Sequence, residues 1–213
     1  SIIHSSLFKN YKLILIDNLL TQRYGSLFNI PTYQNIDFHQ IDIRDDQIEL
    51  FIKDCDILIH LAAITDAESS FDNKKNVKEV NFEGLKKIAI LCSKHKTKLI
   101  FPSTTSVYGT QKDKVDENCL KKELKAQSPY AKTKLQSENF LKKLSISKNL
   151  DYVVCRLGTI FGISAGMRFH TAVNKFCWQS SYGLPLSIWK TAYNQKRPYL
   201  DLQDAIRSFI HII

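Results

Sequence analysis

The sequence predicts an α/β fold in which a parallel sheet carries helices on both faces. Short runs of aliphatic and β-branched residues alternate with longer amphipathic stretches, the pattern of strands joined by crossover helices. The strand runs are apolar almost throughout, which is typical of strands covered on both faces. The composition agrees: 44% of the 213 residues are hydrophobic, and 7 Gly and 5 Pro are too few for a low-complexity or collagen-like chain.

Each strand is predicted from a short apolar run. The expected strands span residues 12–16, 37–43, 57–63, 98–101 and 152–157. Between them, residues 46–53 indicate a short helix. A longer helix follows, because four residues place one apolar stripe along it: Val77, Val80, Ile88 and Leu91.

A further helix is expected to begin at Ser128. The Ser128 hydroxyl can cap the helix, and Pro129 suits the first helical position. The helical pattern continues to about Leu144. After Gly162 the alternation weakens and the sequence becomes polar and aromatic. We therefore expect a sheet domain over 1–162, and over 163–213 part of a smaller subdomain that covers a site and returns to the sheet.

Composition excludes several classes of protein. The five cysteines are odd in number and form no Cys-x-x-Cys pair, which disfavours a disulfide framework or a zinc site and favours a reducing cytoplasm. The longest apolar run, 57–64, contains His60 and is too short to span a bilayer, so a soluble protein without a membrane partner is expected. The net charge of +9 is spread over scattered lysines, which indicates no nucleic-acid partner but would suit a polyphosphate ligand.

Tyr130 and Lys134 form a Tyr-x-x-x-Lys pair. Tyr108 and Lys112 match the same pattern, so the motif alone means little. Tyr130, however, lies in the first turn of a predicted helix, where residues i and i+4 share a face. A lysine cation about 4 Å from a phenolate contributes about 4 kcal/mol at an effective dielectric near 20, which favours Tyr130 as an acid/base. The alternative is a surface tyrosine beside a solvated lysine.

Seven segments, in order and spacing, resemble extended short-chain dehydrogenase/reductases of the NAD-dependent epimerase/dehydratase family, which act on nucleotide sugars. The segments are LILIDN (13–18), DIRD (42–45), HLAA (60–63), FPSTTSVYG (101–109), SPYAKTK (128–134), RLGTIFG (156–162) and RPYLDLQD (197–204). The resemblance implies a Rossmann-type doubly wound sheet, NAD as cofactor, a nucleotide-sugar substrate, no metal and a homodimer when the protein is complete.

The resemblance also implies a cofactor site. An acidic residue at the end of a strand, here Asp17, can accept both ribose hydroxyls and would repel a 2′-phosphate, which favours NAD over NADP. A turn or capping role for Asp17 is the alternative. Asn81 matches a structural asparagine of the family, or is a solvated helix residue. The implied cofactor-binding residues are Asp17, Asn18, Asp42, Ile43, Leu61, Ala62, Ala63, Tyr130, Lys134 and Leu157.

Thr104 matches the family hydroxyl that orients the reacting sugar oxygen, although a strand-end threonine can also serve the local backbone. The 4,6-dehydratases of the family have an Asp-Glu pair where this chain has Thr105 and Ser106. Neither hydroxyl replaces a carboxylate at neutral pH, so the segment is more similar to that of 4-epimerases, and decarboxylation is disfavoured as well.

Three residues are expected to contact the substrate: Thr105, Thr159 and Arg197. Arg197 matches an arginine that binds the nucleotide diphosphate, and a surface ion pair is its alternative. Thr159 stands where an asparagine is common in the family, and Asp201 where many members have histidine. The identity of the sugar is therefore open.

The predicted activity is NAD-dependent epimerisation of a nucleotide sugar by reversible hydride transfer from a ring hydroxyl carbon. Its catalytic residues would be Thr104, Tyr130 and Lys134. Two alternatives remain: a net NAD-dependent dehydrogenase or reductase on nucleotide sugars, and a non-catalytic NAD-binding sensor domain.

The glycine-rich turn of this fold is missing from the sequence. It should precede Asp17 by about 20 residues, yet the first glycine is Gly25. We therefore expect that turn and the first strand to lie upstream of Ser1. In the strand order 3-2-1-4-5-6 that strand is central, between the strands ending at Asp17 and Ala63. The 213-residue chain alone is accordingly expected to be unstable or inactive.

Overall fold

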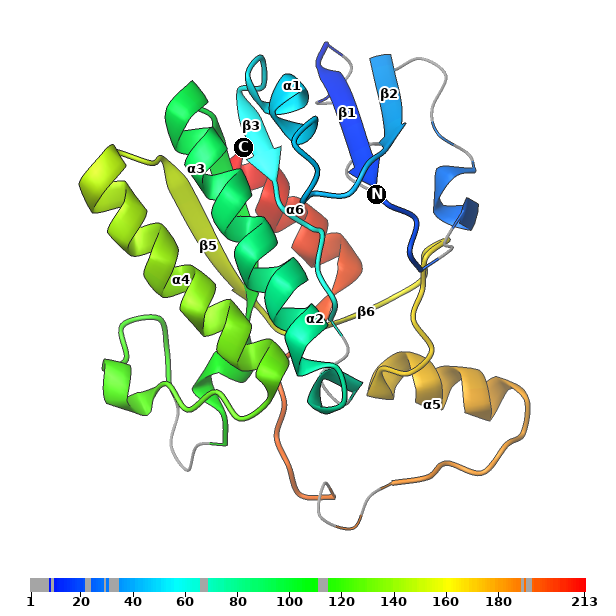
Figure 1. The fold of residues 1–213 in the computed structure, drawn as a ribbon. Helices are drawn as coiled ribbons and strands as arrows, with labels where there is room; N and C mark the ends of the chain where they lie inside the picture. Colours follow the sequence, from blue (N-terminus) through cyan, green and yellow to red (C-terminus); the bar gives the residue numbers. More distant parts are fainter. Residues whose placement is uncertain are drawn as a thin grey trace. The chain divides into compact units, whose positions relative to one another are not determined.

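The computed structural model describes residues 8, 10–21, 24–28, 30, 35–65, 69–110, 115–188, 190 and 193–213 (Figure 1). The chain divides into two compact units. The larger unit comprises 14–18 and 38–156, and the smaller unit comprises 1–13, 19–37 and 157–213. Strands and helices alternate along the chain, which confirms the predicted α/β class.

The sheet of the larger unit has three strands in the order β3 (Ile57–Ile59), β4 (Lys98–Thr104) and β5 (Tyr152–Leu157). β3 and β4 are parallel, with Ile57 opposite Lys98. β5 has the predicted bounds and β4 is longer than predicted. β3 is shorter than predicted: the His60 amide still bonds to the Ile100 carbonyl of β4 at 3.0 Å, and the chain then enters a loop that Asn81 binds at Ile64.

β1 (Lys12–Asp17) and β2 (Asn35–Gln40) form a separate two-stranded sheet. The predicted strand at 37–43 thus ends early, because a turn begins at Asp42, whose carbonyl accepts from the amide of Asp45 at 2.9 Å. Among the described residues no ladder joins β1 or β2 to β3. The predicted additional strand would lie between the strands that end at Asp17 and at Ala63, where no ladder is described. It remains a prediction.

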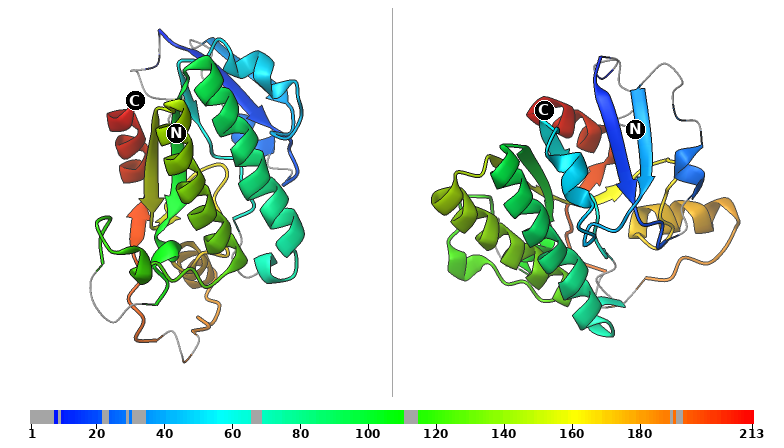
Figure 2. Two further views of the ribbon diagram at one scale, coloured as in Figure 1. Left: turned by 60° about the vertical axis from the view of Figure 1, so that its left-hand side comes forward. Right: turned by 45° about the horizontal axis from the view of Figure 1, so that its top comes forward.

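Helices α3 (Leu85–His95) and α4 (Pro129–Lys148) pack side by side and against β4 (Figure 2). The helix predicted from the apolar stripe is continuous but not uniform: α2 (Lys74–Lys78) passes through a π-helical segment, η5 (Glu79–Gly84), into α3. The short helix α1 (Ile48–Ile52) packs on α3. Three short 3-10 turns complete the unit: η4 (Ser69–Phe71), η6 (Thr105–Tyr108) and η7 (Lys121–Glu123).

The start of α4 follows the prediction closely. The Ser128 hydroxyl accepts from the Ala131 amide at 3.1 Å, and Pro129 is the first helical residue. The helix runs beyond Leu144 to Lys148, where Asn149 adopts a left-handed conformation with φ 53° and ends it. Because the cap determines where the helix begins, it also places Tyr130 in the first turn and Lys134 one turn later.

The core of the larger unit fills the space between these helices and the sheet. Two of the four residues of the predicted stripe, Ile88 and Leu91, belong to this core, and β4 contributes fully buried side chains. Its buried members are Ile48, Ile52, Leu85, Ile88, Ala89, Leu91, Cys92, Leu99, Phe101, Leu141, Leu144 and Leu150. Burial of these side chains supplies the main stabilisation that holds α4 against β4.

The smaller unit contains β6 (Thr159–Phe161) and β7 (Tyr199–Asp201), which pair in parallel, with helices α5 (Ala172–Ser181) and α6 (Leu202–Ile212) and the 3-10 turn η3 (Tyr24–Leu27). The predicted domain boundary at residue 162 remains a prediction. None of the described helices is long and apolar enough to cross a membrane.

Candidate functional site

Helix α4 brings Tyr130 and Lys134 together. Tyr130 is half-buried in the first turn, and Lys134, one turn later, is 4% exposed. The Lys134 ammonium nitrogen lies 6.0 Å from the centroid of the Tyr130 ring and 4.5 Å from that of Phe101. It donates a hydrogen bond to the carbonyl of Pro102 at 2.7 Å. The side chains therefore converge, as their spacing on a helix predicts.

Burial lowers the pKa of Lys134 from 10.5 to about 8, while the carboxylate of Glu138 acts in the opposite direction. Desolvation is the larger effect, but it does not neutralise the amine. At pH 7 about nine in ten molecules still carry the ammonium form. The positive charge that a catalytic tyrosine requires is thus present near neutral pH.

Thr104 ends β4 and is largely buried. Its hydroxyl oxygen accepts from the Ser106 amide at 3.1 Å, which caps η6. Thr104 therefore does bind the local backbone, as its alternative role predicts. This hydrogen bond uses one lone pair of the hydroxyl oxygen, so the hydroxyl can still donate its proton to a ligand. Thr105 is half-buried in the same turn and Ser106 is exposed.

An ion pair that was not predicted from the sequence joins α4 to β5, between the buried Glu138 and the half-buried Arg156. The carboxylate of Glu138 accepts from the Ser103 hydroxyl and from the Arg156 guanidinium, with 2.7 Å to Nη2. The other terminal nitrogen of Arg156 donates to the Tyr108 hydroxyl at 3.0 Å. Glu138 also raises the pKa of Arg156. Tyr108, which matched the Tyr-x-x-x-Lys pattern by chance, has a place in this network. A glutamate one helical turn after Lys134 was the available signal.

His60 lies at the end of β3, almost fully buried, with its ring stacked on Phe101 at 6.2 Å between centroids. Burial, assisted by the charge of Lys134, lowers the pKa of His60 to about 3. The imidazole is therefore neutral at physiological pH and cannot serve there as a proton-carrying acid.

Asn81 holds the loop after β3. Its side-chain oxygen accepts from the Ile64 amide and its side-chain nitrogen donates to the Ile64 carbonyl, both at 2.8 Å. The Ser137 hydroxyl of α4 donates to the Thr133 carbonyl at 2.8 Å and lies 3.4 Å from the Asn81 carbonyl. Asn81 is 2% exposed, so it is a structural residue and not a solvated one. The clamp fixes the loop that carries the predicted cofactor residues Leu61, Ala62 and Ala63.

The predicted adenosine-side residues meet at the ends of β1 and β2. Asp42 accepts from the side-chain amide of Asn18 at 2.9 Å and from the Arg44 guanidinium at 2.8 Å through both Nε and Nη2. Arg44 holds the pKa of Asp42 well below its usual range. Asp17 is exposed and precedes Asn18, and its carbonyl accepts from the Ile41 amide at 3.1 Å.

These residues fit the adenosine half of a dinucleotide. Asp17 presents carboxylate oxygens that can accept from a ribose diol. The nearby cation, Arg44, is bound by Asp42 in a bidentate manner, so it is engaged and does not offer a site for a 2′-phosphate. Ile43 lies beside Gly84 of η5, where an added Cβ would be 2.7 Å from Cδ1 of Ile43. The donor set favours NAD over NADP.

Leu157, Thr159 and Arg197 belong to the smaller unit. Leu157 is half-buried at the end of β5; Thr159 is exposed, with its amide bonded to the Pro198 carbonyl at 3.0 Å. Arg197 is exposed and donates to the Gln195 side chain at 3.0 Å. Asp201 caps α6 through the Gln203 amide at 2.8 Å. Their contact with a substrate remains a prediction.

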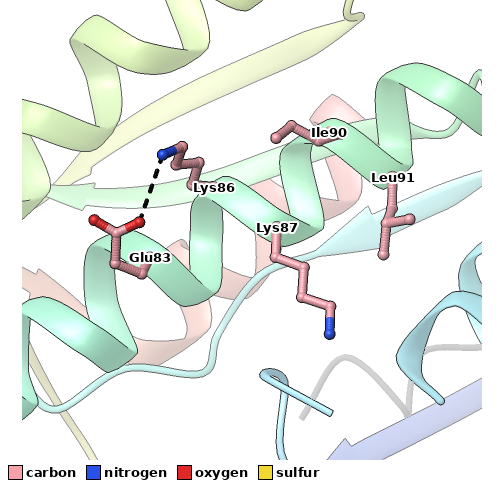
Figure 3. A pocket seen from close by; sticks show the side chains of 5 residues that line it. All are labelled: Glu83, Lys86, Lys87, Ile90 and Leu91. Atoms are coloured by element: carbon pink, nitrogen blue, oxygen red, sulfur yellow. Dashed lines mark ion pairs between the residues drawn. The ribbon is translucent and has the colours of Figure 1, made fainter. Parts of the chain in front are cut away.

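Residues of η5 and α3 line a shallow depression of about 320 Å³ (Figure 3). It is lined by Glu83, Lys86, Lys87, Ile90 and Leu91, and an exposed ion pair of 3.6 Å joins Glu83 to Lys86. The depression contains none of the predicted site residues. In the described part of the chain, no three His, Cys, Asp or Glu side chains gather in a way that could hold a metal ion.

Comparison with known proteins identifies the family. An uncharacterized UDP-glucose epimerase of Bacillus subtilis (strain 168), YtcB, is 25% identical over 214 residues, which cover 96% of this chain and 65% of that protein. A dTDP-D-glucose 4,6-dehydratase of Dictyostelium discoideum is 30% identical over 169 residues, 73% of this chain and 39% of that protein.

The solved structure of a UDP-glucuronic acid 4-epimerase from Bacillus cereus, in complex with UDP-glucuronic acid and NAD, superimposes with a TM-score of 0.83 at 25% identity. The match covers 95% of this chain and 65% of that one, so the chain spans less than two thirds of the length of each of these proteins. This likeness confirms the predicted Rossmann-type fold. All residues from 1 to 213 match one family, and the chain belongs to the NAD dependent epimerase/dehydratase family.

Proposed function

We propose that the protein interconverts nucleotide sugars by reversible, NAD-dependent oxidation of a ring hydroxyl, and that it acts as a 4-epimerase. The observation that carries this proposal is the buried Lys134 ammonium, 6.0 Å from the ring centroid of Tyr130 at the start of α4. Thr104 supplies a hydroxyl at the end of β4 in the same unit. A domain that only binds a dinucleotide has no need of an activated phenol.

In this mechanism Tyr130 removes the proton of the sugar hydroxyl and later returns it. An ordinary phenol, with a pKa near 10, is a weak base at neutral pH. The Lys134 cation stabilises the phenolate, and the N-terminal end of α4 adds a smaller contribution of the same sign. Thr104 donates to the same sugar oxygen and orients it toward Tyr130. NAD, when bound, supplies the reversible two-electron oxidant.

The remaining predicted residues would position the ligands. Asp17, Asn18, Asp42 and Ile43 would hold the adenosine half of NAD, and the Leu61–Ala63 loop and Leu157 would line its path. The Arg197 guanidinium would bind the diphosphate of the sugar nucleotide. Thr105 and Thr159 would contact the sugar.

Dehydration is disfavoured even though a 4,6-dehydratase is among the relatives. Elimination of water requires a further acid and base near the substrate, and η6 carries Thr105 and Ser106 at the positions expected for them. Glu138 does not replace these carboxylates, because Ser103 and Arg156 already bind it on the buried side of α4.

The test is a product analysis of the full protein with NAD and UDP-glucose, UDP-glucuronic acid or dTDP-glucose. We expect the C4 epimer of at least one substrate, detected by chromatography and NMR, without net change in absorbance at 340 nm. A steady increase at 340 nm would instead indicate a dehydrogenase, and a 4-keto-6-deoxy product a dehydratase. NAD binding with no turnover of any of these sugars would indicate a sensor domain.

A further inference from the structure

Glu138 connects the elements that carry the three candidate catalytic residues. It lies one turn after Lys134 on α4, and its side chain is 9% exposed. It accepts from the hydroxyl of Ser103, the residue before Thr104 on β4, and from Arg156 on β5. Arg156 in turn holds Tyr108, which closes the η6 turn that begins after Thr104.

Three elements, α4, β3 and β4, place side chains or backbone groups around Lys134. On its own helix it faces Tyr130 and the carboxylate of Glu138; from the end of β3 it faces the neutral His60. Its neighbours on β4 are the Phe101 ring and the Pro102 carbonyl, which carry no net charge. Glu138 is thus the one anion among the described groups that act on Lys134, and it opposes the effect of burial on the pKa of this lysine.

We propose that Glu138 is a positioning residue: through Ser103 and Arg156 it fixes α4 against the strand end that carries Thr104, and it places a carboxylate one helical turn from the buried Lys134 ammonium. Stability alone does not explain such a pair, because replacing buried ion pairs with packed apolar groups is often neutral or stabilising. The effect of Glu138 on turnover rests on the proposed function, whereas its effect on Lys134 does not.

The direct test is an NMR titration of the full protein labelled with ¹³C-lysine, with the Lys134 signal assigned by its loss in Lys134→Met. In the wild-type protein the midpoint should lie at about 8. In Glu138→Gln we expect it to fall by about one pH unit. The matched control is Glu83→Gln, an exposed glutamate paired only with Lys86 in the described contacts, and it should leave the midpoint unchanged.

The second readout is the pH dependence of epimer formation. If the Lys134 ammonium is required, activity declines as pH rises through its pKa, and Glu138→Gln moves this alkaline limb to lower pH by the same amount as the NMR midpoint. At pH 7.5 the ammonium fraction would then fall about threefold. Ser103→Ala keeps the charge and removes only the hydrogen bond. We expect it to lower kcat severalfold while the alkaline limb stays in place.

Glu138→Gln leaves the Arg156 guanidinium without its carboxylate partner, which can destabilise the fold. The double variant Glu138→Gln, Arg156→Gln removes both charges. Loss of the Arg156 cation offsets part of the effect of losing the carboxylate, so we expect the Lys134 midpoint to fall by less than in Glu138→Gln. An unchanged Lys134 midpoint in a folded variant of either kind would overturn the inference. A shifted midpoint in a protein that epimerises no sugar would retain the inference about Lys134 and reject the proposed function, so the two failures can be told apart.

Discussion

Burial and charge act in opposite directions on Lys134. Transfer of the amine from water to the protein interior lowers its pKa, and the carboxylate of Glu138 partly reverses this. The balance, a pKa of about 8, leaves the lysine charged at neutral pH and within reach of titration above it. The four-residue spacing of Tyr130 and Lys134 predicted that the two side chains are neighbours. The burial of Lys134 could not be predicted in this way, because β4 residues about 30 positions earlier in the chain contact it.

Asn81→Ala tests whether the two hydrogen bonds from Asn81 to the Ile64 backbone stabilise the loop after β3. The variant leaves the Ile64 amide and carbonyl without their side-chain partners, and we expect it to lower the free energy of unfolding by about 2–4 kcal/mol. Urea denaturation measures this change. The control is Asn139→Ala on the exposed side of α4, where the amide bonds only to the Leu135 carbonyl and alanine has the higher helix propensity. A similar effect in both variants would contradict the structural role of Asn81.

At the scale of elements, the position of η5 against the β2–α1 loop depends on Gly84. The φ of Gly84 is −59°, an ordinary helical value, so alanine would by propensity stabilise the helix by about 1 kcal/mol. Its Cβ would, however, lie 2.7 Å from Cδ1 of Ile43. That atom is the end of a flexible side chain and can move, so the two effects nearly cancel in stability.

We therefore expect Gly84→Ala to change the free energy of unfolding by less than about 1 kcal/mol and to weaken NAD binding severalfold, because Ile43 is displaced at the proposed adenine site. Isothermal titration calorimetry with NAD, beside thermal unfolding, measures both quantities. Unaltered NAD affinity in this variant would show that Ile43 does not border the cofactor.

Local signals predicted some elements and not others. Ser128 and Pro129 determine the start of α4 through one capping bond and one fixed dihedral angle, so the sequence was sufficient there. β3 ends at Ile59, before the predicted Ala63, because Asn81 binds the backbone of Ile64 from 17 residues away. The three-residue strands β6 and β7 pair across about 40 residues, a contact with no local pattern.

At the scale of the whole molecule, His60 links stability to pH. The unfolded chain binds a proton on this residue below about 6.5, whereas the folded protein does so only near 3. The unfolded state therefore holds more protons between these values, and stability falls as pH decreases through this range. Between pH 7 and pH 5 the loss due to His60 should be about 2 kcal/mol.

The measurement compares the free energy of unfolding of the wild-type protein with that of His60→Asn at pH 7 and pH 5, by urea denaturation. The wild-type protein should lose about 2 kcal/mol more than the variant over this interval. Asp42 contributes only below its ordinary pKa near 3.8, and Lys134 only above about 8, so neither enters this window. Equal losses in the two proteins would mean that His60 takes up its proton in the folded state at an ordinary pH.

The fold class, the strand at 152–157 and the Tyr130–Lys134 pair could be predicted because each has a local pattern or a family motif. The Glu138–Arg156 pair could not: the spacing of Glu138 one turn after Lys134 indicates a neighbour of the lysine, but nothing local indicates a partner on a strand 18 residues later. Roles assigned through motifs, such as those of Arg197 and Thr159, stay predictions until a ligand is bound to the full protein.

The central claim is that Tyr130 exchanges the proton of the sugar hydroxyl while Lys134 stabilises its anion. The most direct measurement compares Tyr130→Phe with the wild-type full protein for both epimer formation and NAD affinity, with Tyr182→Phe, an exposed tyrosine, as control. We predict that Tyr130→Phe slows epimer formation at least about a hundredfold while NAD affinity stays within about threefold. Epimer formation within about threefold of the wild-type rate in Tyr130→Phe would contradict the claim.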